Sequence, residues 1–259
     1  MQNKTAIVTG STSGIGLGIA TALAETGVNL MLNGFGDAAE IETLRAGLAA
    51  KHGIKVGYSN ADMSKPAEIA QMVATTAETL GSVDILVNNA GIQFTARIEA
   101  FPDDKWDAII AINLSAAFHA IKAAVPLMKQ AGWGRIINIA SAHGLVASEE
   151  KVAYVSAKHG LVGMTKVVAL ENANNGITCN AICPGWVLTP LVQKQIEARA
   201  KASGKSVDEE KKALLGEKQP MLEFSTPESL GGLAVFLCGP STSTMTGTAL
   251  SMDGGWTAQ

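Results

Sequence analysis

Short, strongly apolar runs alternate along the chain with longer stretches in which apolar residues recur every three or four positions. The short runs predict strands at 5–8, 28–33, 54–59, 83–88, 135–140, 176–182 and 248–252. Most are apolar at consecutive positions, which is typical of strands covered on both faces of a sheet. The longer stretches predict helices near 15–26, 38–52, 66–80, 104–130, 153–174 and 227–238. This alternation indicates an α/β fold, a single Rossmann-type, doubly wound, seven-stranded parallel sheet with helices on both faces.

Residues 193–218 differ in composition from the rest of the chain. They carry 12 of its 43 charged residues (20 basic and 23 acidic) and follow the breaks at Pro184-Gly185 and Thr189-Pro190. The pattern predicts one or two exposed amphipathic helices inserted before the last βα pair. We expect this helical insertion, at about 187–220, to be a substrate lid within one domain spanning 1–259. A pair of solvated surface helices fits the same composition equally well.

Composition narrows the class of protein. Only 17% of the 259 residues are charged and the net charge is -3, so we expect no binding of nucleic acid or of a membrane surface. Two uncharged stretches, 5–24 and 231–252, contain several Gly and Ser/Thr residues, which argues against membrane spans. Three cysteines and an N-terminal stretch without a secretory pattern suit the cytoplasm. We therefore expect a cytoplasmic enzyme that acts on a small molecule.

A glycine-rich turn joins the first predicted strand to the first predicted helix. It reads Thr9-Gly10-Ser11-Thr12-Ser13-Gly14-Ile15-Gly16. Glycines let the backbone approach a pyrophosphate, and the N–H groups at the start of the next helix hold its negative charge. The spacing departs from the general Gly-x-Gly-x-x-Gly fingerprint, which would need a third glycine at Ile19. The turn predicts a dinucleotide site.

Three further motifs fall at the carboxyl ends of predicted strands, where open α/β sheets bind ligands. They are Asn88-Asn89-Ala90-Gly91 after the fourth strand, Ser141 after the fifth, followed by Tyr154-x-x-x-Lys158, and Pro184-Gly185 after the sixth. Together with the glycine turn, and in this order, the motifs resemble those of the short-chain dehydrogenase/reductase family over essentially the whole chain. The resemblance implies a nicotinamide cofactor and the transfer of a hydride and a proton.

The catalytic candidates are Asn113, Ser141, Tyr154 and Lys158. Residues at i and i+4 share one helix face, so Lys158 is expected beside the Tyr154 phenol, where its charge would favour the phenolate and lower the tyrosine pKa. By resemblance, Ser141 polarises the substrate oxygen and Asn113 completes a proton relay through water to Lys158. The four histidines are dispersed and no clustered ligand set is present, so we expect no metal site.

The second strand favours NAD over NADP. Its end reads Asn33-Gly34-Phe35, with Asp37 and Glu40 following and no Lys or Arg between Lys4 and Arg45. A 2′-phosphate would find no cationic partner there, although the acidic residue usual for the family at the strand end is replaced. The resemblance places Asp62 at the adenine and Thr189 at the nicotinamide carboxamide. The full set of expected cofactor residues is Gly10, Thr12, Ser13, Gly14, Ile15, Gly16, Phe35, Asp62, Asn89, Ala90, Gly91, Tyr154, Lys158, Pro184, Gly185, Val187 and Thr189.

Four polar residues are placed to hold a small hydroxy or keto acid. They are Gln93, His143, Lys151 and Gln195, with Lys151 and His143 as candidates for local positive charge. A carboxylate out of water needs such donors, although a surface lysine and a loop histidine are the plainer interpretation. The surrounding strings resemble those of the D-3-hydroxybutyrate dehydrogenases, a group within the family. That resemblance implies that the four bind the carboxylate, that Ser141 and Tyr154 meet the reacting oxygen, and that Trp186 and Trp256 are apolar walls or packing residues.

Two other functions remain open at this stage. A 3-oxoacyl carrier-protein reductase would share the scaffold but would prefer NADPH and present basic residues to its acidic carrier. A non-catalytic nucleotide sensor would keep the glycine turn without needing Ser141, Tyr154 and Lys158 together. The weakly charged helices 104–130 and 153–174, together with the family resemblance, suggest a homotetramer.

Overall fold

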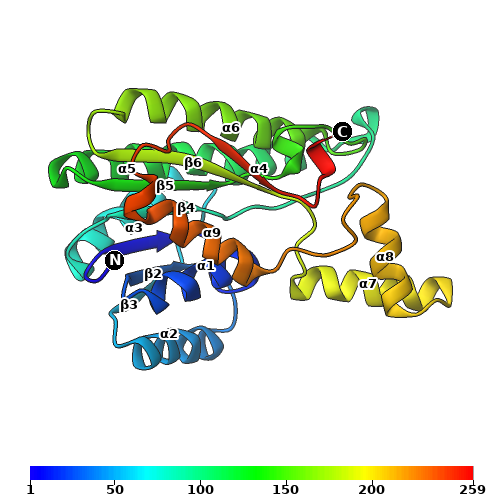
Figure 1. Cartoon of the computed structure of the whole chain (residues 1–259), viewed down its shortest axis with the longest axis horizontal. Helices are drawn as coiled ribbons and strands as arrows, with labels where there is room; N and C mark the ends of the chain where they lie inside the picture. Colours follow the sequence, from blue (N-terminus) through cyan, green and yellow to red (C-terminus); the bar gives the residue numbers. More distant parts are fainter. Residues whose placement is uncertain (259) are drawn as a thin grey trace.

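The seven predicted strands form one fully parallel sheet with the order β3-β2-β1-β4-β5-β6-β7 in a computed structural model, which describes residues 1–258 (Figure 1). Each observed strand end lies within two residues of the predicted one. The strands are β1 (Thr5–Val8), β2 (Asn29–Asn33), β3 (Val56–Ser59), β4 (Ile85–Asn88), β5 (Gly134–Ile139), β6 (Ile177–Pro184) and β7 (Ala249–Met252). The order reverses between β1 and β4, so a ligand crevice is expected beyond their carboxyl ends.

Helices cover both faces of the sheet (Figure 1). One face carries α1 (Gly14–Glu25), α2 (Ala38–His52) and α9 (Pro227–Cys238), and the other carries α3 (Pro66–Leu80), α5 (Ala116–Ala131) and α6 (Val152–Asn172). The central strands are buried along their whole length, as their unbroken apolar runs predicted. Because the helical layers cover both faces, the carboxyl ends of the strands are left at one open edge of the sheet, and the predicted site residues lie there.

The helix predicted at 104–130 is continuous but contains a π-helical turn. It forms α4 (Asp103–Ile110), a π-helical turn (Ala111–Ser115) and α5. The π turn was not predicted, because one wide turn leaves the apolar periodicity almost unchanged, and such turns are common at functional sites. By length and composition the run 103–131 could cross a membrane. In this structure it packs on α3, α6 and the strands β4 and β5.

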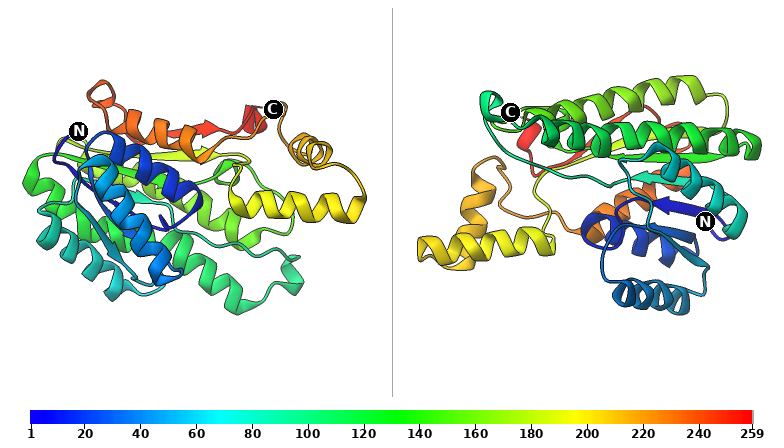
Figure 2. Two further views of the ribbon diagram at one scale, coloured as in Figure 1. Left: turned by 90° about the horizontal axis from the view of Figure 1, so that it is seen from below. Right: turned by 180° about the vertical axis from the view of Figure 1, so that it is seen from behind.

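The charged segment after β6 forms two helices that project from the sheet, α7 (Pro190–Ser203) and α8 (Val207–Gly216) (Figures 1 and 2). Arg199 on α7 is ion-paired with Glu210 on α8 at 3.2 Å and with Glu217 at 2.9 Å. The two chain segments that connect the pair to the sheet lie together, because the Leu188 amide donates to the Ser225 carbonyl at 2.9 Å. The insertion is thus a preformed helix pair on a narrow stem.

Candidate active site

The glycine turn has the geometry that a pyrophosphate requires. Gly10 and Gly14 have φ angles of 63° and 55°, which favour glycine, and a Cβ on Gly16 would lie 2.3 Å from the Gly10 carbonyl oxygen. Ser13 precedes helix α1 as its N-cap residue but makes no side-chain cap hydrogen bond, and the first turn of α1 has no charged residue. Its first N–H groups are therefore donors for an anion. The turn fits a dinucleotide pyrophosphate.

Asn89 fixes this turn against the end of β4. Its side-chain amide donates to the carbonyl oxygens of Thr9 and Gly10 at 2.8 and 3.1 Å, and its backbone N–H donates to the Thr9 hydroxyl at 2.9 Å. The Ala90 N–H donates to the same hydroxyl at 3.0 Å. The Asn-Asn-Ala-Gly motif therefore holds the glycine turn in place beside Gly91 and the catalytic candidates.

Asn33, where the family usually has an acidic residue, turns its side chain inward. It is only 1% exposed, accepts from the Gly10 N–H at 3.2 Å and donates to the Ala61 carbonyl at 3.0 Å. The loop that follows presents Phe35, which is 67% exposed, and Asp37, which caps α2. Asn33 therefore shapes the loop from inside and leaves its outer surface to Phe35 and Asp37.

The other predicted cofactor residues lie along the same edge. Asp62 accepts from the N–H and hydroxyl of Ser64, and these hydrogen bonds lower its pKa. Thr189 caps α7, and its methyl carbon would lie 3.6 Å from a Cβ on Gly14, so α7 starts over the glycine turn. The rest are Thr12, Ser13 and Ile15 in the turn and Pro184, Gly185 and Val187 where β6 ends.

The four catalytic candidates meet at the carboxyl ends of β4 and β5. The Lys158 Nζ donates to the Ile139 carbonyl at 2.7 Å and lies 5.5 Å from the centre of the Tyr154 ring, while Ser141 hydrogen-bonds the Tyr154 side chain. Asn113 is buried in the π turn, and its amide exchanges two 2.9 Å hydrogen bonds with the Ile92 backbone. Tyr154 and Lys158 thus lie side by side, with Ser141 next to the phenol.

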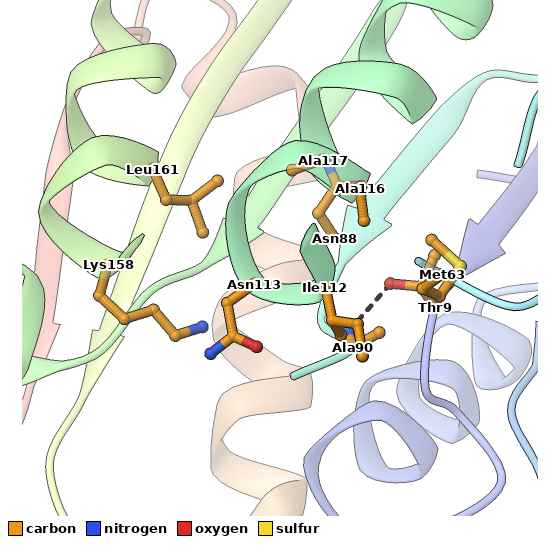
Figure 3. Close-up of a pocket in the computed structure, with 10 residues that line it drawn as sticks. All are labelled: Thr9, Met63, Asn88, Ala90, Ile112, Asn113, Ala116, Ala117, Lys158 and Leu161. Carbon is orange, nitrogen blue, oxygen red and sulfur yellow. Dashed lines mark hydrogen bonds between the residues drawn. The ribbon is translucent and has the colours of Figure 1, made fainter. Parts of the chain in front are cut away.

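A small cavity separates Lys158 from Asn113 (Figure 3). Its volume is about 10 Å³, near the minimum that one water molecule needs. Thr9 and Asn88 add polar side chains to its lining, and both the Lys158 and the Asn113 side chains point toward it (Figure 3). The cavity therefore lies where the family resemblance implies a water between Asn113 and Lys158.

The predicted lowering of the Tyr154 pKa was wrong for the protein alone. Burial raises the pKa of Tyr154 and outweighs the opposing hydrogen bond from Ser141. Burial also lowers the pKa of Lys158 to about 8, and its ammonium is directed at the Ile139 carbonyl rather than at the phenol oxygen. In this structure Tyr154 is a neutral phenol at neutral pH, the form that donates a proton to a ketone.

The lowered Lys158 pKa predicts how stability responds to pH. Between about pH 8 and 10.5 the unfolded chain binds more protons at this group than the folded chain, so its contribution to stability rises over that window. At pH 7 the free energy of unfolding of Lys158→Met should exceed that of the wild type by its largest margin, because the wild type then carries the buried charge. This margin should shrink by about 1–3 kcal/mol by pH 10.5. Urea unfolding of both proteins at the two pH values measures the difference. A constant difference would show that Lys158 carries no buried charge.

His143 lies at the centre of the substrate candidates. Its ring centre is 5.9 Å from that of Tyr154 and 4.9 Å from that of Trp256, both edge-on, and its Nε2 is 2.9 Å from the Ser148 hydroxyl. Burial, then the charges of Lys151 and Lys218, lower the His143 pKa to about 4. The expectation of positive charge on His143 was therefore wrong, because the ring is neutral at pH 7 and serves as a hydrogen-bonding group.

Lys151, just before α6, supplies the charge that His143 does not. Burial lowers its pKa, as does the nearby charge of Lys218, whereas Glu217 raises it. Lys218 follows α8 and was missed as a site residue, since it belongs to no motif. The only sequence signal for it was its place at the end of the charged insertion. The structure thus brings two lysines toward His143.

The remaining substrate candidates are arranged differently. Gln93, beyond β4, and Gln195, on α7, are both exposed. The Trp186 backbone N–H donates to the Gln219 side chain at 2.7 Å, while the Trp186 indole N–H is buried without a partner. Trp256 is 8% exposed. Within residues 1–258 no group of His, Cys, Asp or Glu side chains could hold a metal ion.

Known proteins resemble this chain over its full length. Residues 10–257 match the family model described as enoyl-(acyl carrier protein) reductase. The chain is 60% identical to a D-beta-hydroxybutyrate dehydrogenase of Cupriavidus necator and 55% identical to one of Rhizobium meliloti, with complete coverage of both partners in each case. L-sorbose reductase from Gluconobacter frateurii, solved with NADPH and L-sorbose, has a TM-score of 0.95 at 30% identity, covering 100% of this chain and 98% of that one. The chain is an oxidoreductase that belongs to the short-chain dehydrogenase/reductase family.

Proposed function

We propose that the protein interconverts D-3-hydroxybutyrate and acetoacetate with NAD as the hydride acceptor. The observation that carries this proposal is the position of Lys151, a partly buried cation, next to the neutral His143 ring that packs on Tyr154. A short hydroxy acid has its carboxylate two bonds from the carbon that bears the hydroxyl. An anionic anchor beside a proton-transfer group matches that substrate, and the names of the two relatives support the choice.

The mechanism follows from these positions. Lys151 pairs with the carboxylate, a charge-assisted contact stronger than a neutral hydrogen bond. Ser141 donates to the C3 oxygen. During reduction the neutral Tyr154 phenol donates its proton to that oxygen. During oxidation the phenol first releases its own proton, and the resulting phenolate then takes the hydroxyl proton of the substrate. The glycine turn would hold NAD, which would supply the hydride acceptor for C3. Lys158 and Asn113, with the cavity between them, pass the proton onward from Tyr154. Gln93 and Gln195 complete the carboxylate contacts from the rim.

The preference for NAD rests on the loop after β2. The nearest arginine along the chain, Arg45, is engaged, since its guanidinium pairs with Glu42 and donates to the Val56 carbonyl at 2.9 Å. Asp37 adds negative charge to the loop as the cap of α2. A 2′-phosphate would meet repulsion here with no compensating cation, whereas the free ribose hydroxyl of NAD would not.

We also propose a homotetramer located in the cytoplasm. Large apolar side chains are exposed on the helices expected to pair, with Phe118 on α5 at 48% and Leu170 on α6 at 80% exposure. Phe236 on α9, beside the last strand, is 50% exposed. Such exposed residues favour burial against another copy. All three cysteines are buried and free, which suits a reducing compartment.

A matched set of assays tests substrate and cofactor together. NADH formation is followed with D- and L-3-hydroxybutyrate, each with NAD and with NADP. We expect turnover with the D enantiomer and NAD, with kcat/KM lower by at least about tenfold for NADP because it loses about 1.4 kcal/mol or more of binding. A preference for NADPH with a carrier-linked 3-oxoacyl substrate would instead identify the carrier-protein reductase. Cofactor binding without turnover of any of these substrates would favour a sensor.

A further inference from the structure

Gln219, just beyond α8, is a buried side chain that neither the motifs nor the proposed mechanism uses. It is 4% exposed. Its Oε1 accepts from the Trp186 N–H at 2.7 Å, and its Nε2 donates to the carbonyls of Met221 and Glu223, both at 3.3 Å. Both ends of the amide are therefore occupied within the protein, so Gln219 acts on its surroundings rather than by contacting substrate.

The Gln219 amide lies directly between two turns. A Cβ on Gly185 would be 2.5 Å from its Oε1, and a Cβ on Gly254 would be 2.7 Å from its Nε2. The Met221 N–H adds a 3.0 Å hydrogen bond to the Gly254 carbonyl. Only glycine permits this approach on both sides, so the amide fills the space between the turn after β6 and the turn after β7.

Each of the two turns carries one of the tryptophans. Trp186 directly follows Gly185. Trp256 follows Gly254-Gly255 and belongs to a turn in which the Asp253 carboxylate accepts from the N–H groups of Gly255 and Thr257 at 3.1 and 2.9 Å. These hydrogen bonds make the second turn a rigid unit. A shift at Gly254 therefore passes to the Trp256 ring, which contacts His143.

We propose that Gln219 is a positioning residue that sets the distance between the Trp186 and Trp256 walls and thereby limits the chain length of the substrate. The inference rests on the proposed function. It extends that function by naming what distinguishes a four-carbon hydroxy acid from a longer one. A well-packed wall discriminates against an added methylene by about tenfold or more. Gln219 ties the two walls at a fixed distance, so losing its hydrogen bonds lets them move apart and admit a longer acid, although Gln219 itself does not touch the substrate.

Two variants test the proposal. Gln219→Met keeps the length of the side chain but removes all three hydrogen bonds, and Gln219→Asn keeps an amide but is one methylene too short to span both turns. The measurement is the ratio of kcat/KM for D-3-hydroxybutyrate to that for D-3-hydroxypentanoate, which does not depend on the fraction of active enzyme. We expect this ratio to fall at least about fivefold in each variant, while the Kd for NAD stays within about twofold of the wild type.

Gln193→Met is the matched control. Gln193 lies on α7 of the same insertion, and its side chain donates only to Glu197 at 2.7 Å. The ratio of the two kcat/KM values should therefore be the same in Gln193→Met as in the wild type. An equal loss for both substrates in the Gln219 variants would show a merely structural role and overturn the proposal. If Gln219→Met does not fold, Gln219→Asn decides alone. A wild type inactive on both acids would refute the proposed function and this inference with it, whereas an active wild type with an unchanged ratio in the variants would refute only the inference.

Discussion

Tyr154→Phe should lower kcat for D-3-hydroxybutyrate by about a thousandfold or more. The variant keeps the ring that packs on His143 and loses only the hydroxyl that Ser141 hydrogen-bonds. Positioned acid–base groups contribute about 10²–10⁴ to rate, and Tyr154 is the group on which Ser141 and Lys158 converge. Because the glycine turn that fits the pyrophosphate is built elsewhere, the Kd for NAD should stay within about twofold. Steady-state kinetics and a binding titration measure the two quantities.

Tyr58→Phe is the control for this experiment. Tyr58 is the only other tyrosine of the chain and belongs to β3. Its hydroxyl donates to the Gly34 carbonyl at 2.8 Å. At saturating NAD its kcat should equal that of the wild type. If Tyr154→Phe retained more than a few per cent of the wild-type kcat while Tyr58→Phe behaved as expected, Tyr154 would have no role in proton transfer.

Lys151→Met should raise KM for D-3-hydroxybutyrate by about tenfold to a hundredfold with a smaller change in kcat. The variant keeps the unbranched stem and removes the ammonium. A charge-assisted hydrogen bond to a partly buried carboxylate contributes about 1.5–3 kcal/mol, and this contact is present before and during reaction, so its loss appears mainly in KM. Since Lys218 remains, binding of the anion is weakened rather than abolished.

Lys51→Met gives the matching control, because Lys51 is exposed in the last turn of α2, away from the substrate residues. Its KM should be unchanged. An uncharged analogue, the methyl ester of D-3-hydroxybutyrate, sharpens the result, since its KM should be the same for the wild type and for Lys151→Met. If Lys151→Met had the same KM for D-3-hydroxybutyrate as the wild type, Lys151 would not bind the substrate carboxylate.

The fold was predicted almost completely because most strands have a continuous apolar run and several helices have a clear boundary. Gly53 and Gly81, both with positive φ, end α2 and α3 where the predicted helices stop. The glycine turn and the four catalytic candidates also lie together at the carboxyl ends of the strands, where the motifs predicted them. The π turn around Asn113 escaped because its backbone hydrogen bonds leave no distinct residue pattern.

The electrostatics of the site were not readable from sequence. His143 is neutral and Tyr154 holds its proton more tightly because both are buried, and burial depends on the packing of Trp256 and α6 rather than on neighbours in the chain. The role of Gln219 could not be predicted from the sequence for a related reason. Its importance comes from the space between Gly185 and Gly254, two residues that lie far apart in sequence and meet only in the folded protein.

The narrow stem of the α7–α8 pair has an evolutionary consequence. Few core residues contribute to the stem, so substitutions on the outer faces of the two helices leave the packing of the sheet almost untouched. The helix pair, which we expect to be a substrate lid, is thus free to diverge, while the part that we expect to hold the dinucleotide is constrained by the tight contacts at Gly10 and Gly16. New substrates are therefore open to this scaffold through changes in one short segment, without a new cofactor site having to arise.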